Sequence, residues 1–162
     1  MQKTIRIIAN GQSIPFTTVA TPEEAANEIA EYIAFEAEQG RITDGGELTI
    51  DADDLAAWHL ALHAKKVGAK VGVILSSKTK NLQTQSNIQA KFSMIDTKSA
   101  SNRTAQEKAI HAAILALSGW VGEVMALGKT LKQNVNADIE TALWPELDAQ
   151  SSAVIAALVE EL

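Results

Sequence analysis

The chain has 162 residues, 46% of them hydrophobic and 21% charged, a composition typical of a globular domain that folds without a stabilising metal. It contains no cysteine, which excludes disulfide bonds, iron–sulfur clusters, thiolate zinc sites and cysteine nucleophiles. Its net charge of −6 would argue against general nucleic-acid binding if the charge were evenly spread along the chain.

Residues 4–19 are predicted to form a β-hairpin. Two segments rich in Ile, Thr and Val flank the pair Asn10-Gly11, which favours a type I′ turn because both residues tolerate a positive φ. Pro15 cannot donate a ladder hydrogen bond, so the second strand is expected at the edge of a sheet or bulged there.

A helix is predicted to begin after the hairpin. Thr21 has the character of an N-cap, and Pro22 is suited to the first helical position. The helix should run to about residue 39 and end at Gly40. Its apolar side alternates with six glutamates, so it is expected to be an amphipathic surface helix.

The next segments predict strand, helix and strand. Residues 47–50 form a short β-prone run, and Asp51 is placed to cap a helix that Gly68 would end. The apolar run at 71–75 is typical of a buried strand. A helix between two strands would be a βαβ crossover, so a small mixed sheet is expected.

Residues 76–102 are polar and rich in Ser, Thr, Asn, Gln and Lys. The alternating pattern at 89–95 could be a strand, and its flanks have the composition of loops. We therefore expect a polar, basic loop or edge strand.

The segment 105–133 is strongly helical in character. Thr104 and Glu107 have the spacing of a capping box. Large aliphatic residues then recur at alternating spacings of four and three, the pattern of a heptad seam. The seam residues are Ile110, Ile114, Leu117, Val121, Val124 and Leu131.

Trp120 and three further apolar residues lie outside this seam. A helix that is apolar on more than one side must be buried on more than one side. A second copy of the chain is an economical cover, so these residues predict an oligomer interface. The alternative is that this is the central helix of a monomer.

Charge is distributed unevenly. Residues 1–64 carry a net charge of −8, residues 65–108 carry +7 and residues 109–162 carry −5. A basic block suits phosphate contacts, but one with a single arginine and a single aromatic residue would bind without reading sequence and with strong salt dependence. The candidate phosphate-binding residues are Lys65, Lys66, Lys70, Lys78, Lys80, Lys91, Lys98 and Arg103. The alternative is that the acidic flanks neutralise this block across the fold.

No motif for metal binding or catalysis stands out. His59 and His63 have the spacing of two zinc ligands on a helix, but Leu60 occupies the position of the general-base glutamate. The acidic run at 51–54 lacks the ligand order of a calcium loop and is explained by helix capping. Neither a phosphate-binding glycine loop nor a nucleophile elbow occurs. An active site assembled from scattered residues is the alternative.

These observations predict an α+β fold. It has a small N-terminal β-hairpin or mixed sheet packed with helices, a long heptad-patterned helix and a helical C-terminal half. One domain over 1–162 is expected, with an α+β half at 1–75, the polar segment at 76–102 and a helical half at 103–162.

The predicted function is that of a non-enzymatic interaction or assembly protein, homo-oligomeric through the 105–133 helix, with another protein as an alternative partner. The alternative function is a nucleic-acid-binding accessory protein that uses residues 65–108 without sequence specificity. We expect no cofactor, no metal and no membrane. The apolar stretch Ile5–Ala9, interrupted by Arg6, is too short for a signal peptide or a membrane span, and the lack of cysteine fits a cytoplasmic protein.

Overall fold

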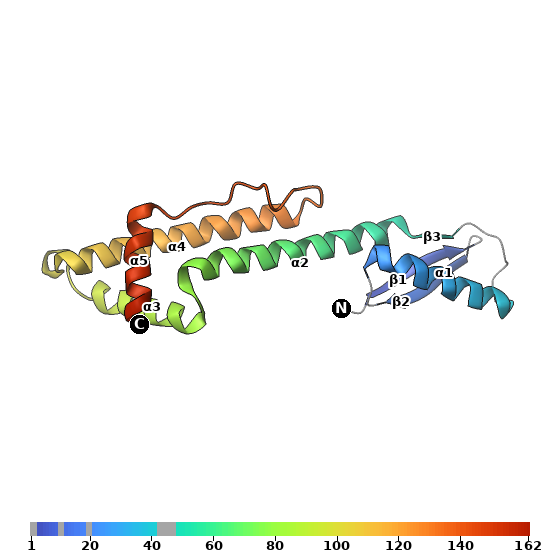
Figure 1. Cartoon of the computed structure of the whole chain (residues 1–162), viewed down its shortest axis with the longest axis horizontal. Helices are drawn as coiled ribbons and strands as arrows, with labels where there is room; N and C mark the ends of the chain where they lie inside the picture. Colours follow the sequence, from blue (N-terminus) through green and yellow to red (C-terminus); the bar gives the residue numbers. More distant parts are fainter. Residues whose placement is uncertain (1–2, 10–11, 19–20, 42–47) are drawn as a thin grey trace. The chain divides into compact units, whose positions relative to one another are not determined.

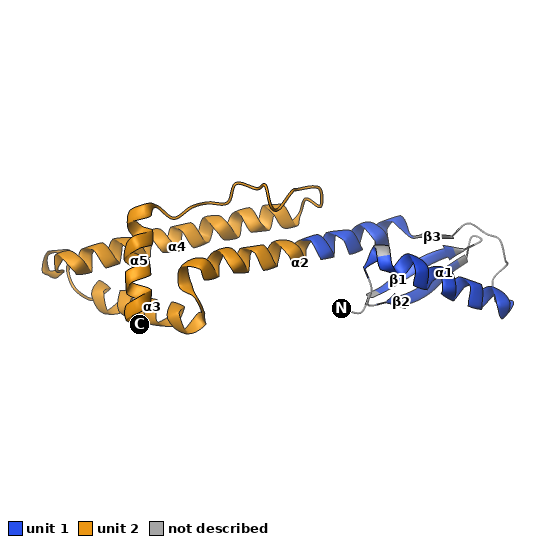
Figure 2. Ribbon diagram, in the orientation of Figure 1, with its two compact units in different colours: residues 1–63 blue, residues 64–162 orange. Residues whose placement is uncertain are grey.

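The computed structural model describes residues 3–9, 12–18, 21–41 and 48–162. It contains two compact units, residues 1–63 and residues 64–162, shown in blue and orange in Figure 2. The described strands all belong to the first unit, and the described elements that lie wholly in the second are helices. The predicted α+β class with a helical C-terminal half is confirmed.

The first unit contains a three-stranded antiparallel sheet in the order β2-β1-β3 (Figure 1). The strands are β1 (Lys3–Ala9), β2 (Gln12–Thr18) and β3 (Leu48–Ile50). The predicted hairpin is confirmed, with Ile7 opposite Ile14 in its register. Its turn at residues 10–11 lies outside the described residues. The strand that holds Pro15 is an edge strand, as its missing N–H group predicts.

The core of the first unit forms on one face of β1. Alternation along the strand places Ile5 and Ile7 on that face, where both are almost fully buried. They pack with Ala25 and Ile29 of α1 (Pro22–Glu38) and with Trp58 of α2 (Ala52–Thr79). The hairpin alone could not bury these side chains, so the two helices complete the core.

The predicted helix start at Thr21 is confirmed. The Thr21 hydroxyl accepts from the backbone N–H of Glu24, and the Glu24 carboxylate accepts from the backbone N–H of Thr21. Gly40 follows the helix at a φ of +68°, a conformation that glycine adopts without steric cost. Local residues therefore determine both ends of α1.

The second unit is built around α4 (Ala105–Lys132). Its other helices are the C-terminal part of α2, α3 (Leu82–Asp96), η1 (Ala100–Asn102) and α5 (Ala149–Glu161). Figure 1 shows α5 crossing α4, and the connecting segment 133–148 returning along α4. The buried residues of all four α-helices, together with Leu147 of that segment, form one apolar cluster.

The prediction of a buried strand at 71–75 is wrong, because these residues lie inside α2. Val71 is buried while Val73 is 66% exposed, so the run has one buried side. Gly68 does not end the helix; it lies in the helix interior, where a Cβ would meet the side chain of Lys132 at 3.7 Å. The expected crossover and mixed sheet are therefore absent, and the described sheet is antiparallel throughout.

The prediction of a loop or edge strand at 76–102 is also wrong. Helix α3 occupies most of it, beginning at Asn81, whose side chain accepts from the backbone N–H of Thr84 at 2.9 Å. Ile88 and Ile95 are buried and Phe92 packs against the same cluster. Three apolar residues at spacings of four and three are enough to dock a helix whose other sides are polar.

Candidate functional site

The helix α4 carries the residues predicted to form an oligomer interface, and most of them lie inside the second unit. The buried ones are Ile110, Ile114, Leu117, Trp120, Val124 and Leu131, and Val121 is half-buried against the same cluster. The chain's own helices thus cover the heptad seam. A seam of this kind is satisfied equally by helices of one chain or by a second copy.

A second 4-3 repeat runs along the opposite side of α4, and its residues are exposed. We call this side the outer face; it consists of Lys108, Ala112, Leu115, Gly119, Gly122 and Ala126. Leu115 is 53% exposed, as is Met125 at the margin of the face. The sequence contained this signal, but a search limited to large aliphatic residues passes over a repeat made mainly of Ala and Gly.

The two glycines of the outer face have open space beside them. A Cβ built on Gly119 or Gly122 would meet no atom within 4 Å. Glycine in the middle of a helix costs about 0.5–1 kcal/mol relative to alanine. Open glycines on an exposed side allow the backbone of another helix to come close.

The basic segment is partly paired with carboxylates of the same chain. Four of the eight candidate phosphate-binding residues form ion pairs. The pairs are Lys70–Glu140 at 2.5 Å, Lys80–Glu160 at 2.6 Å, Lys98–Glu107 and Arg103–Asp96 at 3.0 Å. The hydrogen bond from Lys80 holds the pKa of Glu160 below its usual value. Within the described residues, Lys65, Lys66 and Lys91 form no ion pair.

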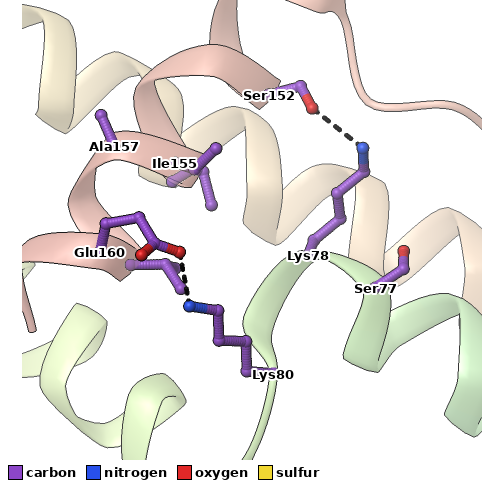
Figure 3. Close-up of a pocket in the computed structure, with 9 residues that line it drawn as sticks. Ser77, Lys78, Lys80, Ser152, Ile155, Ala157 and Glu160 are labelled. Atoms are coloured by element: carbon purple, nitrogen blue, oxygen red, sulfur yellow. Dashed lines mark hydrogen bonds and ion pairs between the residues drawn. The ribbon is translucent and has the colours of Figure 1, made fainter.

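Lys78 and Lys80 border a pocket of about 350 Å³ between the end of α2 and α5 (Figure 3). Lys78 Nζ donates to Ser152 Oγ at 2.9 Å, and Lys80 Nζ donates to Glu160 Oε1. The Ser77 hydroxyl on the rim donates to the carbonyl oxygen of Ile74. These polar groups are engaged within the chain, so the two lysines connect α2 to α5.

Asp96 lies at the centre of a small polar cluster at the end of α3. His111 Nε2 is 2.9 Å from Asp96 Oδ1, and the Arg103 guanidinium donates to the same oxygen at 3.0 Å. The ring of Phe92 stacks on His111 with centroids 4.9 Å apart. The hydrogen bond from His111, followed by that from Arg103, lowers the pKa of Asp96 from its usual 3.8. This cluster joins the end of α3 to the beginning of α4.

We expect Asp96→Asn to destabilise the second unit at neutral pH. Because the folded-state pKa of Asp96 is lowered, the carboxylate contributes stability above pH 3.8, and this contribution is lost as the pH falls through the lowered pKa. Urea unfolding should therefore show a less stable variant at about pH 7 and a much smaller difference in acid. Glu146→Gln is the control: Glu146 is exposed and forms no ion pair among the described residues, so this change should leave the stability at neutral pH almost unchanged. Equal stability of Asp96→Asn and wild type at neutral pH would contradict the stabilising role of the Asp96 carboxylate.

The acidic run at 51–54 has a structural role. Asp51 Oδ1 accepts from the backbone N–H groups of Asp53 and Asp54 at 3.1 Å, which confirms the predicted cap. The Arg6 guanidinium lies 3.0 Å from Asp51 and 3.1 Å from Asp54. These carboxylates therefore connect α2 to β1.

The two histidines predicted at zinc-like spacing lie on α2, with His63 buried and His59 half-buried. Across the described part of the chain, no group of three or more His, Asp or Glu side chains is close enough to hold a metal ion. The pair alone would supply two of the four ligands that a zinc ion takes.

Helix α4 is the one described helix long and apolar enough to span a bilayer, with a mean hydropathy of 1.6 in its most apolar 18-residue window. A third of that window is buried inside the chain. Core helices of globular proteins share this length and composition. The expectation that the chain binds no membrane stays a prediction.

Comparisons with protein-family models, with curated proteins and with solved structures found no match to this chain. A functional assignment therefore has to be argued from the residues and geometry described above.

Proposed function

We propose that this chain is a non-enzymatic assembly protein that associates with further copies of itself through α4. The observation that carries the proposal is the exposed outer face of this helix, where Leu115 remains 53% exposed after the rest of the second unit has packed. Burying an apolar side chain of this size contributes about 1.5–3 kcal/mol. A symmetric dimer would bury Leu115 twice.

The surface we propose differs from the one that the sequence predicts. The heptad seam containing Val124 is covered by helices of the same chain, so it is not available to a second copy without opening the unit. The outer face needs no such opening. Its open glycines, Gly119 and Gly122, allow close approach of two helix backbones without rearrangement of α4.

Replacing Leu115 with glutamate tests the proposal. We expect the wild type to be a dimer or larger at micromolar concentration, and Leu115→Glu to weaken association at least about a hundredfold, because the lost apolar burial and the added charge both oppose contact. The measurement is mass by light scattering, with circular dichroism to show that the fold is kept. A wild type that runs at its chain mass of 17.3 kDa would overturn the proposal.

The matched control is Leu82→Glu. Leu82 is 80% exposed on α3, so it is not part of the outer face of α4. The change adds the same charge and removes the same side chain, so the control should keep the wild-type mass. A loss of association in both variants would point to net charge rather than to the outer face.

Salt dependence separates this proposal from nucleic-acid binding through residues 65–108. Association through a mainly apolar face should weaken far less with ionic strength than phosphate contacts do. Phosphate contacts weaken steeply between about 50 and 200 mM salt. A duplex that binds the wild type at low salt and is released at moderate salt would favour the alternative function over self-association.

A further inference from the structure

We propose that two copies of α4 pack antiparallel across their outer faces, with Lys108 of each copy opposite Glu123 of the other. This inference rests on the proposed function and specifies the partner, its orientation and its register. It starts from two exposed, oppositely charged side chains that border the apolar part of the outer face.

Lys108 and Glu123 lie on the same side of α4. At about 3.6 residues per turn, both fall close to the line through Ala112, Leu115 and Gly119. They are separated by about 22 Å along the axis at 1.5 Å per residue. Ala112, Leu115, Gly119 and Gly122 of the outer face thus lie between a positive end and a negative end, with Ala126 beyond Glu123.

Both charges are unpaired in the described part of the chain. Among the described residues, Lys108 and Glu123 form no ion pair. The neighbouring carboxylate, Glu107, is already engaged by Lys98 and by the backbone N–H of Thr104. Lys108 is therefore an available cation at the beginning of the outer face.

The orientation follows from these charges. In a parallel two-fold pair, each residue near the axis meets its own copy, so Lys108 would approach Lys108 and Glu123 would approach Glu123. In an antiparallel pair, each lysine can lie opposite a glutamate. Opposite charges across an interface favour one register and like charges oppose the alternative.

The register that matches these charges also suits the small residues. Its two-fold axis passes beside Leu115, midway between Lys108 and Glu123. The two copies of Leu115 then meet at the centre, and Ala112 of one copy lies opposite Gly119 of the other. A Cβ on Gly119 has open space in the free chain, so this position can accept the methyl group of Ala112.

Charge reversal tests the register. Lys108→Glu and Glu123→Lys should each weaken the dimer about tenfold, because each places like charges opposite one another twice. The double variant should restore wild-type affinity. The measurement is the dissociation constant by sedimentation at low salt, with circular dichroism as the control for folding. Single variants that dimerise like the wild type would overturn the antiparallel register.

Cysteine cross-linking provides the second test, and the chain is suited to it because it has no native cysteine. Ala112→Cys and Gly119→Cys, mixed and oxidised after exchange of subunits, should give a disulfide between positions 112 and 119. Peptide mass spectrometry identifies the product. Disulfides joining only identical positions would overturn the antiparallel arrangement and leave self-association intact, whereas a monomeric wild type would remove the proposed function itself.

Discussion

Replacing Trp120 with alanine is expected to lower the free energy of unfolding of the second unit by about 3–5 kcal/mol, the usual cost of truncating a buried tryptophan. Trp120 is 5% exposed in the apolar cluster of this unit. Its indole N–H donates to the carbonyl oxygen of Pro145 at 2.8 Å. The side chain therefore holds the connecting segment 133–148 against α4 as well as filling the core.

Denaturant unfolding followed by circular dichroism measures this effect. Trp120→Phe is the matched control: it keeps a ring in the core and loses the hydrogen bond to Pro145, so it should cost less, about 1–3 kcal/mol. If Trp120→Ala instead kept the stability of the wild type and changed only the oligomeric state, Trp120 would be an interface residue, as the sequence predicted.

The second large effect is a difference in sign between two glycine-to-alanine changes. A Cβ on Gly128 would lie 2.7 Å from Cγ2 of Val71, so Gly128→Ala forces α2 and α4 apart and should cost about 1–3 kcal/mol. A Cβ on Gly72 would meet no atom within 4 Å. Gly72→Ala should therefore stabilise the chain by about 0.5–1 kcal/mol through helix propensity.

Both changes lie inside long helices, so alanine contributes the same gain in helix propensity at each position. The difference in packing therefore decides whether the free energy of unfolding rises or falls. Thermal unfolding of the two variants beside the wild type provides the measurement. Similar shifts of both variants in the stabilising direction would mean that α2 and α4 do not approach closely at Gly128.

Local signals predicted the elements whose ends are determined by neighbouring residues. Thr21, predicted as an N-cap, and Thr104, predicted as part of a capping box, both cap their helices in the structure. The hairpin followed from the pair Asn10-Gly11 between two β-prone segments, and the edge position of the second strand followed from the missing N–H group of Pro15. These features depend on contacts within a few residues or on one tight turn, so the chain order alone contains the information.

Two predictions were wrong because the structure at those positions depends on contacts with residues distant in the chain: the helix end at Gly68 and the strand at 71–75. Gly68 resembles a helix end, but it lies beside Lys132, and Gly128 is required by Val71. The apolar run at 71–75 has the composition of a buried strand, and only its packing against other helices reveals a helix with one buried side. A run of this length does not distinguish the two by periodicity.

The charge blocks are visible in the sequence, but their pairing is visible only in the structure. A basic middle segment between acidic flanks is visible in the sequence. Which lysines are neutralised depends on the fold: Lys70 meets Glu140 and Lys80 meets Glu160, each across at least seventy residues of chain. The sequence alone therefore could not show which of the candidate phosphate-binding residues are already paired with carboxylates of the same chain.

By itself, the sequence determined that the chain is α+β, that 105–133 is a helix, and that this helix is apolar on more than one side. The tertiary structure showed which side of this helix is covered by other helices of the same chain. Burial of the heptad seam depends on how α2, α3 and α5 pack, and packing joins residues far apart in the chain. Once the large aliphatic residues face inward, the small residues of the outer face and Leu115 are what remains exposed on the opposite side of this helix.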